Sequence, residues 1–261
     1  MKTDNLNNVF IDFFKKNNID FRKNKFLVAV SGGIDSVVMF YLYKKNKINF
    51  SVCSCDFSLR GKESSGDSLF VRNLCEKYAV KFYSKKFYTK KYALEKKVSI
   101  QMSARELRYK WFYQLLKDYK YNYLSTAHHN DDNLETILIN FIKTTGYRGL
   151  SGIPSINDFT IRPLLQTSKR LLIDYAKKNN LDWREDKSND DIKYLRNNLR
   201  KQIIPSLKTI NPSIKTSILN SSRRLNMVRN FIESEIKIFK NKYLSEQNQI
   251  FVINKGEWIN N

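Results

Sequence analysis

Cysteine, histidine and proline are scarce in this chain of 261 residues, which has three cysteines, two histidines and four prolines. The cysteines, Cys53, Cys55 and Cys75, are too few for a disulfide framework, and their odd number favours reduced thiols in the cytoplasm. No run approaches the ~20 apolar residues of a membrane span, and the first ten residues lack the apolar stretch of a secretory signal. The composition therefore predicts a folded cytoplasmic protein that has no membrane association.

Acidic side chains are also few, at 25 against 47 basic ones, which gives a formal net charge of +22. Such an excess is typical of proteins that bind nucleic acid. Codon bias is an alternative cause, because lysine, asparagine and isoleucine, whose codons are rich in A and T, make up 85 of the 261 residues. Composition alone leaves both causes open.

Short β-branched runs alternate with longer apolar stretches of helical spacing through the first 142 residues. We expect strands at residues 26–30, 49–55, 80–87 and 122–126, and helices at 37–43, 68–78, 101–118 and 132–142. This alternation predicts an α/β fold with a doubly wound, mostly parallel sheet. Further helices are expected at 168–179, 194–204 and 216–244. A boundary near Pro205–Pro212 would separate a catalytic domain, residues 1–205, from a small helical C-terminal region, residues 206–261.

The segment Ser31-Gly32-Gly33-Ile34-Asp35-Ser36 lies where the first expected strand ends and a helix begins. Its glycines let backbone N–H groups approach an anion, and the helix N-terminus adds a partial positive charge. The two serine hydroxyls can donate further hydrogen bonds. The segment matches neither G-x-x-x-x-G-K-[ST] nor G-x-G-x-x-G. We interpret it as a phosphate-binding loop; an ordinary glycine turn is the alternative.

A second polar segment, Ala127–Thr136, contains both histidines, His128 and His129, and follows another expected strand. Ligands of open α/β sheets bind at this carboxyl edge. Asp132 and Glu135 are three residues apart on the next helix and so share one face. A zinc site is not favoured, because adjacent histidines point apart and no cysteine is near in sequence. Helix capping by Asp131 or Asp132 is the structural alternative.

The S-G-G-x-D-S loop resembles that of the PP-loop ATP pyrophosphatases, whose fold is adenine nucleotide alpha hydrolase-like. A-H-H-x-D-D-x-x-E-T at 127–136 is similar to the tRNA(Ile)-lysidine synthase family within that superfamily. So are D-F-S-L-R-G-K-E-S at 56–64, A-R-E-L-R-Y at 104–109, the glycine-rich residues 146–153 and R-N-N-L-R at 196–200. The resemblance runs from about Lys25 to Pro212 and is weak beyond it, so we interpret the chain as a short member of the family or a fragment.

The resemblance implies a ligase that adenylates the 2-carbonyl of the wobble cytidine of tRNA(Ile) with a CAU anticodon. ATP and Mg²⁺ would serve this step, and free L-lysine would then displace AMP to give lysidine, changing codon reading from AUG to AUA. ATP would lie over residues 31–36, with Asp35 as a magnesium ligand and Arg108 stabilising the developing charge. Asp132 and Glu135 would bind the amino groups of lysine. His128 or His129 would accept a proton or contact phosphate.

Four other arginines are candidates for substrate binding, and each of them has an alternative, purely structural interpretation. Arg105 is one helical turn from Arg108, so both can face one anion; a solvated helix face is the alternative. Arg196 and Arg200 have the same spacing and suit an RNA backbone, although a solvated face fits almost as well. Arg60 belongs either to the site or to a salt bridge with Glu63.

Two other functions stay open at this point. A PP-loop tRNA thiolase would use a C-x-x-C pair or a further cysteine, whereas Cys53-Ser54-Cys55 has a different spacing. A non-catalytic tRNA-binding protein with a relic ATP site is the other, and the intact loop argues against it. GMP and NAD synthetases share the loop but lack the segments at 104–109 and 127–136. We assign the three cysteines to the core and leave a homodimer open.

Overall fold

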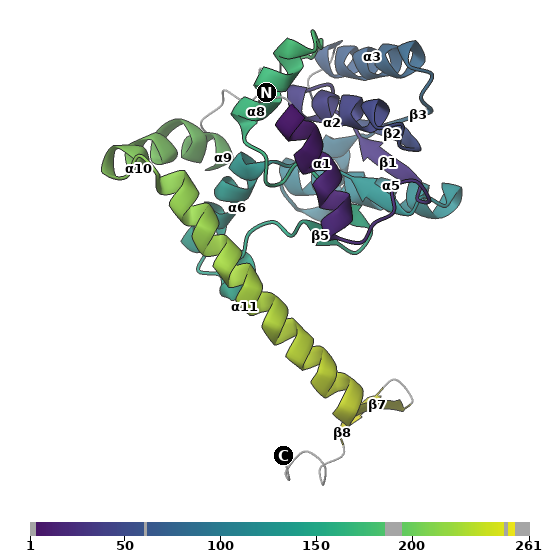
Figure 1. Ribbon diagram of the computed structural model, residues 1–261. Coiled ribbons are helices and arrows are strands. Elements are labelled where there is room, and N and C mark those ends of the chain that lie inside the picture. The colour runs from purple at the N-terminus through teal and green to yellow at the C-terminus, as the bar shows by residue number, and fades with distance from the viewer. Residues whose placement is uncertain (1–3, 60–61, 186–194, 248–249, 254–261) are drawn as a thin grey trace. The chain divides into compact units, whose positions relative to one another are not determined.

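The computed structural model describes residues 4–59, 62–185, 195–247 and 250–253 (Figure 1). The chain divides into two compact units, one of Met1–Asn133 with Pro154–Asp191 and one of Leu134–Ile153 with Ile192–Asn261. This division differs from a single cut near residues 205–212, because the second unit also takes up residues 134–153 and resumes at residue 192. The position of the catalytic-domain boundary therefore stays a prediction.

The first unit is built on a six-stranded sheet in the order β3-β2-β1-β4-β6-β5. Only the β5–β6 pair is antiparallel, which confirms the expected mostly parallel sheet. The central strand β1 pairs on both sides, with Phe26 opposite Phe50 and Tyr123. The strands are β1 (Phe26–Ala29), β2 (Phe50–Asp56), β3 (Phe82–Lys86), β4 (Tyr123–Ser125), β5 (Ile156–Asn157) and β6 (Thr160–Ile161).

Helices pack on both faces of this sheet, because successive strand residues point to opposite sides. Phe26 and Val28 of β1 belong to a core with α1, α2, α3 and α8, whereas Leu27 packs with α5. Helix α1 was not among the expected helices, and its Phe10 and Phe14 are fully buried. The helices of this unit are α1 (Asp4–Lys16), α2 (Ile34–Lys45), α3 (Lys62–Lys77), α4 (Thr89–Lys96), α5 (Ile100–Tyr119) and α8 (Lys169–Lys178).

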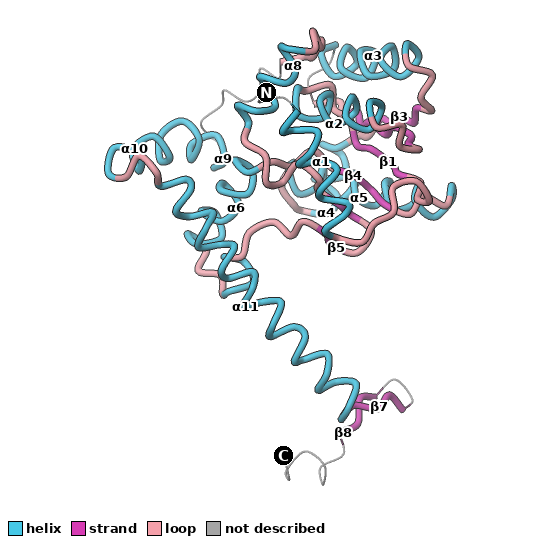
Figure 2. Tube along the Cα trace, in the orientation of Figure 1, coloured by secondary structure: helices cyan, strands magenta, loops and turns pink. Residues whose placement is uncertain are grey.

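The second unit is mainly helical, and α6 (Asn130–Ile142) runs into it from the first unit (Figure 2). Leu134 and Ile137 of α6 pack on Leu219 of the long helix α11. The helix expected to end before Pro205 instead gives way to a π-helical turn and then α10, with Pro205 in its first turn, where the missing N–H is tolerated. The other elements are α7 (Tyr147–Leu150), α9 (Leu195–Asn198), the π-helical turn η2 (Leu199–Ile203), α10 (Ile204–Ile210), α11 (Ile214–Tyr243), β7 (Leu244–Gln247) and β8 (Ile250–Ile253).

The cysteines and the helices bear on two composition-based predictions. All three cysteines are free thiols; Cys53 and Cys75 are buried as predicted, and Cys55 is half-buried. Among the residues that the structure describes, no helix has the length and apolar character needed to cross a membrane.

Candidate active site

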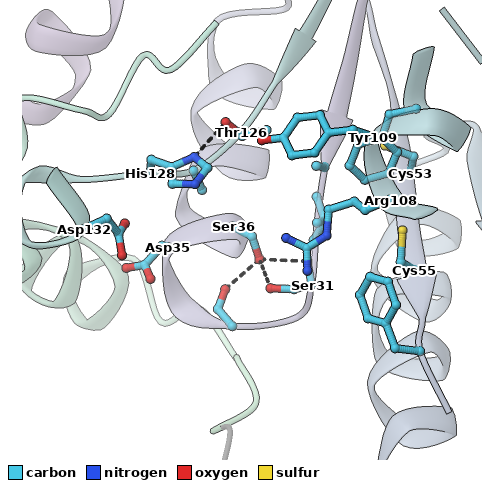
Figure 3. Close-up of a pocket in the computed structure, with 16 residues that line it drawn as sticks. Ser31, Asp35, Ser36, Cys53, Cys55, Arg108, Tyr109, Thr126, His128 and Asp132 are labelled. Carbon is cyan, nitrogen blue, oxygen red and sulfur yellow. Dashed lines mark hydrogen bonds between the residues drawn. The ribbon is translucent and has the colours of Figure 1, made fainter. Parts of the chain in front are cut away.

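A cavity of about 380 Å³ opens at the carboxyl ends of the neighbouring strands β1 and β4. The chain continues from β1 to β2 in one direction along the sheet, and from β4 to the β5–β6 pair in the other direction. Open α/β sheets bind ligands at the point where the strand order reverses in this way. One wall is the loop after β1, another is the segment after β4, and a third is α5 (Figure 3). The cavity is lined by Ala29, Val30, Ser31, Gly33, Asp35, Ser36, Cys53, Cys55, Phe57, Arg108, Tyr109, Phe112, Thr126, Ala127, His128 and Asp132.

The loop after β1 has the geometry of an anion-binding turn. Gly32 has φ +89°, a conformation that favours glycine, and a Cβ there would also lie 3.4 Å from the Phe70 ring. The Ser36 hydroxyl donates to the Gly33 carbonyl at 2.8 Å and accepts from the Ser31 N–H at 3.1 Å, which fixes the turn. Gly33 caps α2 without a side-chain hydrogen bond, so the first amides of the helix can face a ligand.

Asp35, in the first turn of α2, forms an ion pair with Lys169, which no sequence motif indicated. The Lys169 ammonium donates to both carboxylate oxygens, at 2.6 and 2.8 Å. Burial by itself would raise the pKa of Asp35, but hydrogen bonding and electrostatic attraction from His129 and Lys169 outweigh burial and lower it. Asp35 is therefore ionised at neutral pH.

His129 is buried, with 4 % of its surface exposed, and lies between two carboxylates. Its Nδ1 accepts a hydrogen bond from the Asp131 backbone N–H at 3.2 Å. Nε2 lies 3.6 Å from Oδ2 of Asp35 and 3.6 Å from Oδ2 of Asp132. The Asp132 carboxylate also accepts the backbone N–H of His129 at 2.9 Å. This hydrogen bond caps the start of α6, which is the structural role that the sequence offered for Asp132. Figure 3 shows the carboxylates of Asp35 and Asp132 pointing toward one another.

The opposite wall of the cavity supplies a cation and aromatic surface. The Arg108 guanidinium lies 5.0 Å from the centre of the Phe57 ring, and Figure 3 shows it pointing into the cavity beside Ser31. His128 lines the cavity, and its Nδ1 is 2.9 Å from the Thr126 hydroxyl. An arginine fork held against a ring is well placed to bind phosphate.

The cysteines at this wall are neutral thiols. Burial raises the pKa of Cys55 to about 12, only partly offset by the positive charges of Arg108 and Lys85. Burial also raises the pKa of Cys53 well above its usual range. Neither side chain therefore supplies a thiolate at neutral pH.

Comparison with known proteins identifies the family to which the chain belongs. The family model described as "PP-loop domain" matches residues 3–207. The chain belongs to the PP-loop family. This PP-loop chain is 37 % identical over 237 residues, 91 % of its length, to a tRNA(Ile)-lysidine synthase of Bacteroides thetaiotaomicron. It is 39 % identical over 216 residues, 82 % of its length, to a tRNA(Ile)-lysidine synthase of Porphyromonas gingivalis. It spans 56 % and 48 % of these proteins, about half the length of the curated relatives it matches.

Solved structures show the same fold at low sequence identity. A U34-tRNA thiolase of Methanococcus maripaludis superimposes with a TM-score of 0.69 at 19 % identity, over 86 % of this chain and 79 % of that one. An NH3-dependent NAD synthetase of Campylobacter jejuni superimposes with a TM-score of 0.51 at 17 % identity, over 95 % of this chain and 100 % of that one. These likenesses confirm the predicted PP-loop fold class and carry no information on substrate.

Several residues predicted for the site do not line the PP-loop cavity. Glu135, expected beside Asp132, is 1 % exposed and accepts from Nε and Nη2 of Arg200 at 2.8 and 2.7 Å. Arg200, expected to face RNA, thus has a protein carboxylate as partner. Arg196 is exposed, with Nη2 3.4 Å from the Thr136 hydroxyl. Arg105 is exposed over the Tyr109 ring. Arg60 lies outside the described residues.

Proposed function

We propose that this chain uses ATP to adenylate the 2-carbonyl of the wobble cytidine of tRNA(Ile) with a CAU anticodon, and then attaches free L-lysine. The observation that carries the proposal is the single cavity that combines the loop of residues 31–36, Arg108 and the facing carboxylates of Asp35 and Asp132. Phosphate and an amine are the two ligand types that these groups suit. The names of the relatives, tRNA(Ile)-lysidine synthase, support the choice of RNA and lysine.

In the first step the cytosine oxygen forms a bond to the α-phosphorus, and the bond from that phosphorus to the β-phosphate bridging oxygen breaks. The amides of the loop and the serine hydroxyls bind phosphate oxygens, and the Arg108 fork neutralises charge that builds up on them. Pyrophosphate leaves with the electron pair. Asp35 stays ionised here, because Lys169 and His129 hold its pKa low.

Mg²⁺ fits the donor set of the cavity. Asp35 and Asp132 present hard carboxylate oxygens that point toward one another, and magnesium is commonly bound by one or two carboxylates together with substrate phosphates. The bound ion would neutralise phosphate charge. Lys169 and His129 keep both carboxylates oriented through their contacts with Asp35 and Asp132.

In the second step the ε-nitrogen of lysine forms a bond to C2 of the cytosine, the bond from C2 to the adenylated oxygen breaks, and AMP leaves with the electron pair. The ε-amine must first lose a proton, since its ordinary pKa is about 10.4. The carboxylate of Asp132 faces the cavity and favours binding of the ammonium group. His129 is a positioning residue in this proposal, because it is buried and its Nε2 lies 3.6 Å from both Asp35 and Asp132. His128, which lines the cavity, is the better acceptor of a proton. A lysine-binding role for Glu135 requires that Arg200 release it.

The proposal is tested by incubating the chain with ATP, radiolabelled lysine and tRNA(Ile), and measuring label in RNA and release of pyrophosphate. Asp132→Asn leaves the carboxylate of Asp35 for Mg²⁺, so it should slow lysine transfer at least tenfold more than it slows adenylation, and the adenylated intermediate should accumulate. Asp174→Asn, which changes an exposed carboxylate of α8, is the matched control. Absence of lysine-dependent labelling of RNA by the wild type would overturn the proposal. Sulfur transfer is disfavoured, because Cys53 and Cys55 are neutral thiols.

A further inference from the structure

A second cavity, of about 620 Å³, lies further along α5 than the active-site cavity. It is at the amino edge of the sheet, because Tyr121 precedes β4 and Phe159 precedes β6. Its walls are aromatic and basic: Tyr113, Tyr121 and Phe159 line it together with Lys117 and Lys120. The Phe159 side chain is 61 % exposed, and none of the described ring contacts involves it.

A continuous strip of side chains on α5 joins the two cavities. Arg105, Tyr109, Tyr113 and Lys117 are spaced four residues apart and so share one helix face. The Arg105 guanidinium lies 5.0 Å from the centre of the Tyr109 ring, and the rings of Tyr109 and Tyr113 are 5.9 Å apart. Tyr109 lines the active-site cavity, and Tyr113 lines the second one. The strip therefore leads directly from one cavity to the other.

Lysines and tyrosines extend this surface beyond the second cavity. The hydroxyl of Tyr121 is 3.1 Å from that of Tyr83, whose ring lies 4.8 Å from the Tyr119 ring. The Lys81 ammonium lies 4.9 Å from the centre of the Tyr119 ring. Aromatic rings interleaved with lysines are the surface on which single-stranded nucleic acids stack. The net charge of +22 favours the same class of ligand.

We propose that the second cavity takes an unpaired base of the RNA substrate, a close neighbour in the strand of the base that reacts. The base would stack on Phe159 and Tyr113, its phosphates would contact Lys117 and Lys120, and Asp158 would accept a hydrogen bond from a base N–H. Four to eight residues separate Tyr109 from the lining residues Tyr113 and Lys117, which is about 6–12 Å along the helix. Neighbouring nucleotides of one strand span that distance. This proposal rests on the proposed function, since it assigns a further contact to the same RNA.

Phe159→Ala and Tyr113→Ala test the proposal. The matched control is Tyr88→Ala, which changes an aromatic residue that is 74 % exposed and follows β3, at the opposite edge of the sheet from the second cavity. Affinity is measured for an anticodon stem-loop RNA by filter binding, and for ATP by calorimetry without RNA. Loss of one stacked base should weaken RNA binding by about 5- to 150-fold. ATP affinity should not change, and Phe159→Trp should restore RNA binding because it keeps a stacking surface. Circular dichroism checks the fold of each variant.

Each outcome separates this proposal from the proposed function. If Phe159→Ala and Tyr113→Ala bind RNA as tightly as Tyr88→Ala, the second cavity does not bind RNA, and a protein partner becomes the explanation for its exposed rings. If the wild type binds neither the stem-loop nor full-length tRNA, the proposed function itself fails. If both variants lose RNA affinity while Phe159→Trp keeps it, a stacked base is supported.

Discussion

Replacing Arg200 with methionine removes a cation that contacts the carboxylate of Glu135, which is almost completely shielded from water. The Glu135 side chain is 2 % exposed, and its Oε1 lies 2.8 Å from Nε and 2.7 Å from Nη2 of Arg200. Removing one partner of a buried ion pair costs about 3–5 kcal/mol, because the remaining charge stays buried. The Arg200 side chain is 45 % exposed, which screens the pair, so we expect a loss of about 3 kcal/mol.

Urea denaturation of Arg200→Met should show this loss in the free energy of unfolding. Arg196→Met is the matched control, because Arg196 is exposed and touches only a hydroxyl among its described contacts; its effect should stay within about 0.5 kcal/mol. Adding Glu135→Gln to Arg200→Met removes the buried charge and should recover more than half of the loss. Equal stability of the two methionine variants would show that the reasoning is wrong. RNA affinity that falls without any loss of stability would instead assign Arg200 to the RNA.

Three other outcomes are expected. Folding lowers the pKa of Asp35 below its ordinary value of 3.8. The ionised carboxylate therefore contributes its full stabilisation above pH 3.8, and this stabilisation is lost as the pH falls through the lowered pKa of the folded protein. Asp35→Asn should therefore destabilise the protein at pH 7 and much less at pH 3 in urea denaturation, and an equal loss at both would refute the assignment. Cys55, with its pKa of about 12, should react with iodoacetamide far more slowly in the folded protein at pH 8 than in urea; equal rates would contradict its burial. RNA affinity should fall steeply between about 50 and 200 mM salt, whereas an insensitive affinity would assign the basic excess to codon bias.

Local signals account for the parts of the fold that the sequence predicted well. The strand expected at 26–30 is observed at Phe26–Ala29, and the helix expected at 216–244 at Ile214–Tyr243. Ser168 caps α8 as expected, accepting the Leu171 N–H at 3.2 Å. These features depend on periodicity and capping within a few residues. The two-residue strands β5 and β6 are too short to leave such a pattern.

Long-range contacts explain what the sequence did not disclose. The bond from Lys169 to Asp35 joins residues 134 positions apart, and nothing local marks one lysine among 33. The same holds for Arg200, whose spacing suited an RNA backbone but whose partner is Glu135, 65 positions away. Helix α1 was within reach, because Leu6, Phe10 and Phe14 recur every four residues and are buried together. The cavity-lining role of Asp132 followed from its place just after a strand.

The length of α5 between Arg108 and Leu116 is fixed, because one face of this stretch packs in the core and another lines the active-site cavity. Trp111, Phe112, Leu115 and Leu116 fill the core beneath the sheet, while Arg108 reaches the active-site cavity. One residue inserted between Arg108 and Leu115 would turn everything beyond it by about 100°. Either the arginine would leave the cavity or the apolar side chains would leave the core. Evolution can therefore substitute residues on α5, but insertions and deletions in that stretch are not tolerated and must fall in the surrounding loops.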